Sequence, residues 1–360
     1  MRIGVPREIK PLEGRVGLIP AACAELLSAG HEVFVESGAG NASGCSDEDY
    51  RRVGVTLCGD AAMLYEKAEL VVKVKEPVEG DLEHLRPDHL LFSYLHLAAN
   101  PDLTDRLLAI GLTAIGFETV QEADGSLPLL APMSDIAGRL SIQLGTHLLH
   151  QPQGGKGLLL GGLPGAGRGR VVIIGAGTAG GNAARYAAAV GAEVTVFDRK
   201  HHKLAAMRAL GANVTALFPY QDAIGEAVTG ADLVVGAVLI PGARAPHVVT
   251  RAHVERMQPG SVVVDISVDQ GGCIETTRPT DYRQPTYTVD GVVHLAVTNL
   301  PGAVPRSASQ ALSAAVTPYL LALARLGRDG LKDHPALRRG LNLAAGRILL
   351  PALETNGHGL

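Results

Sequence analysis

The sequence predicts an α/β protein with two domains, each built around a mainly parallel β-sheet. Short aliphatic runs alternate with helical patterns from the first residue onward, which is typical of parallel strands joined by helices. Hydrophobic residues make up 46% of the chain but aromatic residues only 4%, and this aliphatic excess suits sheets that helices cover on both faces. A length of 360 residues allows two cores of normal size.

The first series of elements begins at the N-terminus. Residues 2–5 form an aliphatic run that predicts a strand, residues 20–30 predict a helix closed by a glycine, and residues 32–35 predict a second strand. Aliphatic runs predict three further strands, at residues 70–74, 90–92 and 112–116. These strands define the first predicted sheet.

A second series follows a connecting helix, predicted at residues 140–150, and a glycine-rich stretch at residues 153–168. Its strands are predicted at residues 171–174, 192–197, 233–237 and 262–266. Apolar residues then recur at helical spacing over residues 307–326, so we expect the chain to return to the first domain. The predicted domains are residues 1–127 plus 305–360, and residues 128–304.

Charge, cysteines and hydropathy exclude several classes of protein. A net charge of −4 gives no reason to expect nucleic acid or a membrane surface as a partner. The four cysteines lack the spacing of a zinc site or a disulfide framework, so we expect reduced thiols and no metal. No apolar run reaches the roughly 18 residues of a membrane span, and the start lacks the apolar core of a signal peptide. We therefore expect a cytoplasmic protein.

The most informative motif is Gly-Ala-Gly-Thr-Ala-Gly at residues 175–180, which follows a predicted strand and opens an alanine-rich stretch. Gly175 permits a tight turn, Gly177 lets backbone N–H groups approach a pyrophosphate, and Gly180 lets the next helix pack closely on the sheet. Asp198 ends the next strand, where its carboxylate accepts hydrogen bonds from ribose hydroxyls and repels a 2′-phosphate. This order predicts an NAD site; the alternative is a glycine turn that serves close packing only.

Four polar residues follow predicted strands, at the end where open α/β sheets bind ligands: Arg15, Lys75, His96 and Asp269. Each of these residues also has an ordinary structural interpretation. Arg15 would then be a solvated surface charge, and Lys75 would form a surface ion pair with Glu76. His96 would be a histidine of the core or of a loop, and Asp269 would form a turn. A guanidinium binds a carboxylate through two parallel hydrogen bonds, a lysine adds a charge, and a histidine moves protons. Together they predict a site for a small carboxylate with a carbon to be oxidised.

The chain resembles the alanine dehydrogenase family. Residues 4–10, Gly-Val-Pro-Arg-Glu-Ile-Lys, and residues 13–16, Glu-Gly-Arg-Val, are similar to the N-terminal signature of that family. Other similar segments lie at residues 72–77, 94–98, 132–134, 175–180, 237–242, 265–272 and 299–305. The resemblance covers nearly the whole chain and implies two Rossmann-like doubly wound domains joined by long helices, in a homohexamer.

The resemblance also implies the NAD-dependent, reversible oxidative deamination of L-alanine to pyruvate, ammonia and NADH. It implies that Arg15 and Lys75 hold pyruvate or alanine, and that His96 and Asp269 carry catalysis. The residues that it implies around the cofactor are Ser134, Gly175, Gly177, Gly180, Asp198, Lys203, Tyr220, Leu239, Ile266 and Asn299. Tyr220 departs from the small polar residue that we expect in the wall of the adenine pocket.

Two other functions remain open on the same features. One is the soluble dinucleotide-binding part of a proton-translocating transhydrogenase, which passes hydride between two nicotinamides. The other is a non-catalytic nucleotide-binding scaffold, because a fold by itself does not fix an activity. Arg15, Lys75 and His96 favour an amino-acid site over the first, and a scaffold is expected to lack one or more of the four polar residues, all of which are present.

Overall fold

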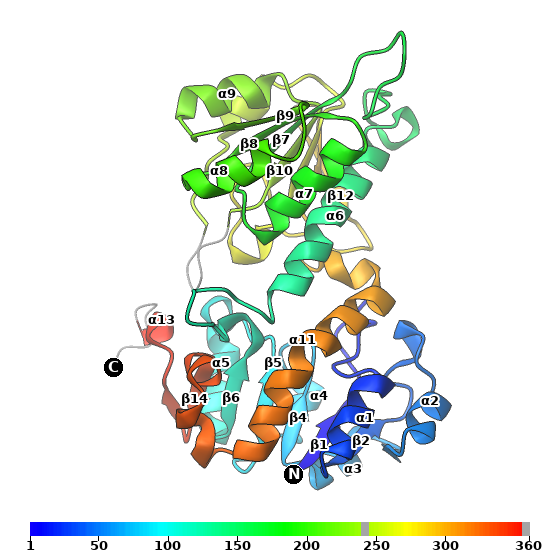
Figure 1. The fold of residues 1–360 in the computed structure, drawn as a ribbon, viewed down its shortest axis with the longest axis vertical. Coiled ribbons are helices and arrows are strands. Elements are labelled where there is room, and N and C mark those ends of the chain that lie inside the picture. The colour runs from blue at the N-terminus through cyan, green and yellow to red at the C-terminus, as the bar shows by residue number, and fades with distance from the viewer. Residues whose placement is uncertain (239–244, 355–360) are drawn as a thin grey trace. The chain divides into compact units, whose positions relative to one another are not determined.

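The computed structural model describes residues 1–238 and 245–354. The chain forms two compact units, one of Met1–Met133 with Gly302–Leu360 and the other of Ser134–Pro301 (Figure 1). Each unit has its own mostly parallel sheet flanked by helices, which confirms the predicted fold class. Within the described part of the chain, no helix is long and apolar enough to cross a membrane.

The first unit contains an eight-stranded sheet in the order β15-β14-β6-β5-β4-β1-β2-β3. The strands β1 to β6 pair in parallel, whereas β14 is antiparallel to both β6 and β15. Their bounds are β1 (Arg2–Val5), β2 (Glu32–Glu36), β3 (Thr56–Cys58), β4 (Leu70–Val72), β5 (Leu90–Ser93), β6 (Thr113–Gly116), β14 (Leu341–Ala344) and β15 (Arg347–Ile348). The antiparallel edge comes from the C-terminal segment, which returns to this unit.

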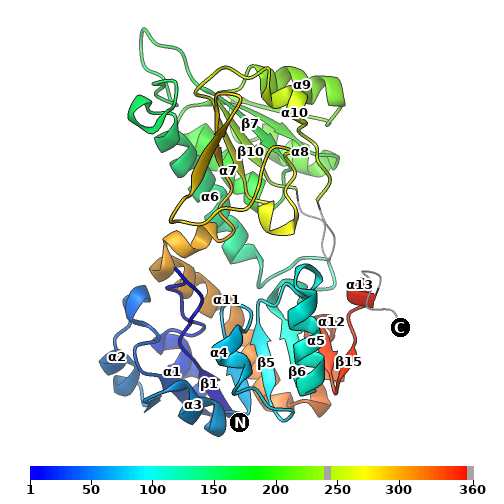
Figure 2. The same cartoon turned by 180° about the vertical axis from the view of Figure 1, so that it is seen from behind.

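Helices cover both faces of the first sheet. The helices α1 (Pro20–Ser28) and α11 (Pro305–Leu326) pack together on one face (Figure 1), and α5 (Pro101–Ile110) lies on the other (Figure 2). α11 also holds the loop after β1, because the hydroxyl of Ser309 accepts a hydrogen bond from the Val16 N–H at 2.9 Å. The remaining helices of this unit are α2 (Asp47–Arg52), α3 (Ala61–Lys67), α4 (Glu79–Leu82), α12 (Pro335–Arg339) and α13 (Pro351–Glu354).

The second unit contains a seven-stranded sheet in the order β12-β13-β11-β10-β7-β8-β9, in which only β12 is antiparallel to its neighbour among the described strands. Its strands are β7 (Arg170–Ile174), β8 (Glu193–Phe197), β9 (Val214–Leu217), β10 (Leu233–Gly236), β11 (Val262–Asp265), β12 (Thr286–Val289) and β13 (Val292–Leu295). Its helices are α7 (Thr178–Ala189), α8 (His201–Arg208), α9 (Gln221–Thr229) and α10 (Arg251–Val254). α6 (Ala131–Leu148) begins nine residues before the predicted connecting helix and leads into this unit.

The aliphatic runs exist because the central strands are buried on both faces. Along β7, Val171 and Ile173 join one hydrophobic cluster with the alanines of α7. Val172 and Ile174 join a second cluster with residues of α9. Side chains alternate between the two faces of a strand, so a strand with two covered faces needs apolar residues at every position.

The strand order reverses once in each sheet. In the first sheet β1 lies between β2 and β4, and in the second β7 lies between β8 and β10. Helices that leave such a strand pass to opposite faces of the sheet, which opens a crevice outside the carboxyl ends of the strands. The loops after β1, β4, β7 and β10 are therefore the places where ligand-binding residues are expected.

Candidate active site

Three of the proposed site residues follow neighbouring strands of the first sheet. Arg15 lies in the segment after β1, Lys75 follows β4 and His96 follows β5. Because β4 pairs in parallel with both β1 and β5, these three segments leave the same edge of the sheet. The fold therefore gathers a guanidinium, an ammonium and an imidazole at one edge.

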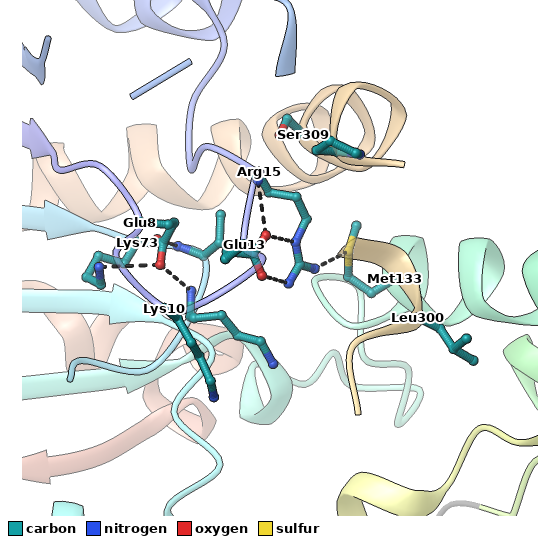
Figure 3. A network of polar contacts seen from close by, with 12 residues as sticks. Glu8, Lys10, Glu13, Arg15, Lys73, Met133, Leu300 and Ser309 are labelled. Atoms are coloured by element: carbon teal, nitrogen blue, oxygen red, sulfur yellow. Dashed lines mark hydrogen bonds and ion pairs between the residues drawn. The ribbon is translucent and has the colours of Figure 1, made fainter. Parts of the chain in front are cut away.

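Arg15 is buried and paired with Glu13 (Figure 3). Its Nε donates to Oε1 of Glu13 at 2.7 Å and its Nη2 donates to Oε2 at 2.5 Å. Nη1 faces the sulfur of Met133 at 3.2 Å. Burial by itself would lower the pKa of Arg15, but the hydrogen bonds and charge of Glu13 raise that pKa above its ordinary value. Arg15 is therefore no solvated surface charge, and one edge of its guanidinium is engaged within the chain.

A buried acid–base cluster holds the segment that carries Lys75. The carboxylate of Glu8 accepts hydrogen bonds from the Val74 N–H at 2.6 Å and the Lys75 N–H at 3.4 Å. The ammonium of Lys73 lies 3.4 Å from Glu8 and 3.0 Å from Asp81, and its side chain is 1% exposed. Burial raises the pKa of Glu8, against the opposing charge of Lys73. These contacts fix the backbone just before and at Lys75.

Glu76 lies near both Lys75 and His96. Burial by itself would raise the pKa of Glu76, but Lys75, the ion-paired Lys10 and the nearby His96 together lower it. Lys75 is only 8% exposed, so its charge acts on Glu76 in a buried place and not at the surface. Lys75 and His96 thus share Glu76 as a neighbour.

The ring of His96 stacks on a fixed aromatic surface. The rings of Tyr94 and His96 are nearly parallel, with an interplanar angle of 3° and centroids 5.9 Å apart. The hydroxyl of the buried Tyr94 donates to the carbonyl oxygen of Leu129 at 2.6 Å, which fixes the tyrosine ring. His96 itself is half-buried. A half-buried imidazole on a rigid support has the access and the orientation that proton transfer needs.

In the second unit, the glycine motif forms the turn between β7 and α7. Gly175 has a φ of +102°, which an L side chain rarely adopts, and a Cβ at Gly180 would lie 1.8 Å from the carbonyl oxygen of Gly175. Gly177 is the N-cap of α7, and a Cβ there would meet open space. A turn that glycine adopts readily, a close helix contact and an open helix N-terminus fit the requirements of a pyrophosphate site.

Asp198 follows β8 beside this turn. Its Oδ2 accepts a hydrogen bond from the Ala176 N–H at 2.8 Å, and its Oδ1 accepts one from the Lys200 N–H at 2.8 Å. The ammonium of Lys203 lies 3.7 Å from Oδ2. The carboxylate is therefore fixed against the backbone of the glycine motif, which is where the ribose of a dinucleotide would lie.

The other residues proposed for the cofactor are spread over the second unit. Ser134 and Asn299 are half-buried near the two chain ends of this unit, and Ile266 directly follows β11. Tyr220 is 69% exposed, and its ring lies 4.9 Å from that of Phe218. Leu239 lies outside the described residues.

Asp269 is exposed and lies in the short 3-10 helix Val268–Gln270 after β11, in the second unit. The buried carboxylate of Asp265 organises this loop, since it accepts four hydrogen bonds of 2.8 to 3.1 Å. The donors are the N–H groups of Ser267, Cys273 and Ile274 and the hydroxyl of Thr277. Burial raises the pKa of Asp265, and these hydrogen bonds act in the opposite direction.

Sequence reasoning assigned no role to Glu8, Glu13 or Asp265. The sequence around Asp265 does indicate a structural role. A charged residue inside the apolar run Val-Val-Val-Asp-Ile is expected to be buried and therefore hydrogen-bonded. Glu8 and Glu13 lie in polar segments without such a contrast. Among the described residues, no three His, Cys, Asp or Glu side chains are grouped so that they could hold a metal ion.

Known proteins resemble this chain over nearly its whole length. The family model described as "Alanine dehydrogenase/PNT, N-terminal domain" matches residues 4–137, and the one described as "Alanine dehydrogenase/PNT, C-terminal domain" matches residues 141–351. An alanine dehydrogenase of Mycolicibacterium smegmatis is 47% identical over 355 residues, which covers 98% of this chain and 96% of the relative. For an alanine dehydrogenase of Geobacillus stearothermophilus the identity is 48% over 359 residues, with 98% and 95% covered.

Solved structures show the same pattern. A structure described as L-alanine dehydrogenase matches with a TM-score of 0.94 and 49% identity, and the match covers 99% of both chains. A transhydrogenase from Sinorhizobium meliloti matches with a TM-score of 0.83, covering 98% of this chain and 100% of the other. Its identity is 23%, so this second likeness shows a shared fold alone.

Proposed function

Since the chain belongs to the alanine dehydrogenase/PNT family, we propose that it is an L-alanine dehydrogenase, which oxidises L-alanine reversibly to pyruvate and ammonia with NAD as hydride acceptor. The observation that carries the proposal is the meeting of Arg15, Lys75 and His96 at one edge of the first sheet. A small amino acid offers a carboxylate for the two cations and a reacting carbon for the imidazole.

Arg15 and Lys75 bind the substrate carboxylate. Glu13 engages Nε and Nη2 of Arg15, which fixes the plane of the guanidinium that meets the substrate carboxylate. Lys75 is buried at the neighbouring strand end and adds a second positive charge. Charge-assisted hydrogen bonds in such a low-dielectric place are stronger and more specific than those in water.

NAD, held by the glycine motif and Asp198, would supply the hydride acceptor for Cα of alanine. Loss of hydride from an alanine whose amino group has first given up a proton yields an iminium. Water adds to the iminium carbon, and ammonia leaves while the hydroxyl of the adduct loses its proton and becomes the carbonyl of pyruvate. In its neutral form His96 removes a proton from the attacking water, and it later returns a proton to the leaving nitrogen. Asp269 orients the water and stabilises the positive nitrogen through its negative charge.

The preference for NAD over NADP rests on Asp198. Its two oxygens are already fixed by backbone N–H groups, so the carboxylate cannot readily turn away from a 2′-phosphate. The like charges would repel in a partly desolvated place. Ribose hydroxyls, in contrast, are donors that a fixed carboxylate accepts.

The test uses the purified full chain, NAD and a panel of L-amino acids with glycine, and it follows NADH formation. L-alanine should give the highest kcat/KM, and pyruvate with ammonia should be the best pair in reverse. His96→Ala and Asp269→Ala should each lower kcat by about 10²–10⁴-fold with NAD binding retained. Hydride exchange between two nicotinamide analogues without oxidation of any amino acid would instead support a transhydrogenase part. NAD binding without either activity would support a scaffold.

We also propose that the chain forms a homohexamer in the cytoplasm. Leu159 and Leu163 are 57% and 56% exposed, and their burial in a subunit contact would support this assembly. Sedimentation equilibrium measures the number of subunits directly. A monomer at micromolar concentration would contradict the hexamer without affecting the proposed reaction.

A further inference from the structure

His96 has a backbone conformation that L side chains rarely adopt. Its φ and ψ angles are 48° and 38°, in the left-handed region. For a residue other than glycine this conformation costs roughly 1–2 kcal/mol. Left-handed residues of this kind persist when the surrounding contacts hold them, and they concentrate at functional places.

A carboxylate from the neighbouring strand end holds this turn. Oε1 of Glu118 accepts a hydrogen bond from the His96 N–H at 2.7 Å, and the Leu95 N–H lies 3.2 Å from both carboxylate oxygens. Glu118 belongs to the 3-10 helix Phe117–Thr119, which directly follows β6. Since β6 pairs in parallel with β5, the carboxylate comes from the strand next to the one that leads to His96.

Further contacts fix the other side of His96. The side-chain amide of Asn100 donates to the carbonyl oxygen of His96 at 3.1 Å. Together with the ring of Tyr94 stacked on the imidazole, these contacts hold the peptide groups before and after the His96 Cα and the plane of its ring. Glu118 makes the charged contact in this set, and charge-assisted hydrogen bonds are about twice as strong as neutral ones.

We propose that Glu118 is a positioning residue for His96. Its carboxylate stabilises the left-handed turn and thereby sets the direction in which the imidazole meets the substrate. This inference rests on the proposed role of His96 in proton transfer. Glu118 exchanges no proton with the substrate; it acts through the backbone of His96. Misplacing a catalytic group by about 1 Å can lower a rate roughly 10²-fold. We therefore expect the loss of Glu118 to lower kcat.

Three single variants of the full chain measure the effect. Glu118→Ala should lower kcat for alanine by about 10–100-fold, with KM and the NAD dissociation constant changed less than about threefold. Glu118→Gln keeps an acceptor oxygen for the His96 N–H and should recover much of the lost kcat. Glu69→Ala is the matched control, since Glu69 accepts a backbone N–H from Arg2 at 2.8 Å at the opposite edge of the sheet. It should leave kcat unchanged.

A double-mutant cycle with His96→Ala separates positioning from general stabilisation. If Glu118 acts through His96, adding Glu118→Ala to His96→Ala should lower kcat by less than about twofold, because groups that act as a unit are not additive. Equal losses in both backgrounds would overturn the positioning role and leave the proposed function intact. Full activity of His96→Ala by itself would overturn the proton-transfer role of His96, and with it the positioning role of Glu118, while oxidation of alanine by the chain would still stand. If Glu118→Ala does not fold, the same cycle with Glu118→Gln shows whether the loss of kcat depends on the presence of His96.

Discussion

The carboxylate of Glu13 binds the Nε and Nη2 nitrogens of Arg15, two residues further along the same loop, and the two side chains are 0% and 3% exposed. This pairing fixes the plane of the guanidinium. A substrate carboxylate therefore meets a guanidinium whose direction is already set.

Arg15→Lys should therefore fail although it keeps the charge. A lysine can neither form the two parallel bonds to Glu13 nor present a second edge to the substrate. Breaking a buried ion pair costs about 3–5 kcal/mol, and the substituted ammonium recovers only part of that. We expect a large fall in kcat/KM for alanine and a lower free energy of unfolding, with NAD affinity unchanged. Wild-type kcat/KM would show that Arg15 does not bind substrate.

Two glycines of the same motif should respond differently to alanine. Gly180→Ala places a Cβ 1.8 Å from the Gly175 oxygen, so the helix must move and the free energy of unfolding should fall. Gly177→Ala places its methyl group in open space, so stability should be kept while NAD affinity falls, because the methyl group faces the proposed pyrophosphate. Urea unfolding and NAD titration of both variants check this pair. Unchanged NAD affinity in Gly177→Ala would argue against the proposed phosphate position.

Asp198→Ala should relax the choice of cofactor. Removal of the carboxylate eliminates the like-charge contact with a 2′-phosphate. It also removes the negative partner of the Lys203 ammonium, which lies 3.7 Å from Oδ2 of Asp198 in the wild-type chain. We expect kcat/KM with NADP to rise and kcat/KM with NAD to fall. Asp198→Asn is the matched control for size. If the wild-type chain uses NADP as well as NAD, Asp198 does not set the preference.

The stability of the second unit should fall in mild acid because of His294. This histidine is buried, its Nδ1 donates to the Val292 carbonyl at 3.0 Å, and its Nε2 lies 2.8 Å from the Thr276 hydroxyl. Burial lowers the pKa of His294 below its ordinary value of 6.5. Below about pH 6.5 the unfolded chain therefore binds a proton that the native chain does not, and the free energy of unfolding decreases as the pH falls towards the native pKa.

Unfolding in urea between about pH 8 and pH 5 measures this dependence. His294→Gln should be less stable than wild type at the alkaline end and should show a flatter decline with acid. Burial also lowers the pKa values of His31, His89 and His253, so the difference between variant and wild type isolates the contribution of His294. Parallel curves would mean that His294 does not titrate in this range.

Much of the fold followed from pattern because buried parallel strands require unbroken aliphatic runs. β3 was missed, since Thr-Leu-Cys is short and mixed, and so were β9 and β12 to β15. The pairing of β14 with β6 joins segments more than 200 residues apart, and only the folded chain defines it. The outermost strands of both sheets, parallel and antiparallel, therefore escaped a prediction that rested on long aliphatic runs.

Positions in the candidate site were easier to predict than partners. The rule that ligands bind at carboxyl ends of strands selects Arg15, Lys75 and His96 without knowledge of their contacts. The role of Glu118 was not predicted, because its carboxylate binds backbone N–H groups. The direction of a backbone N–H group cannot be predicted from the pattern of side chains along the sequence. The pairing of Glu13 with Arg15 likewise depends on the burial of both, which a polar loop sequence does not reveal.

The contribution of α11, β14 and β15 to the first unit has a consequence for synthesis on the ribosome. The second unit is one continuous stretch, Ser134–Pro301, and all of its strands are available before the last part of the chain is made. The first unit waits for α11, whose Ser309 holds the loop next to Arg15, and for β14, which pairs with β6. Domains generally fold as units during translation. Nascent chains should therefore acquire the dinucleotide-binding unit first and complete the loop that carries Arg15 last.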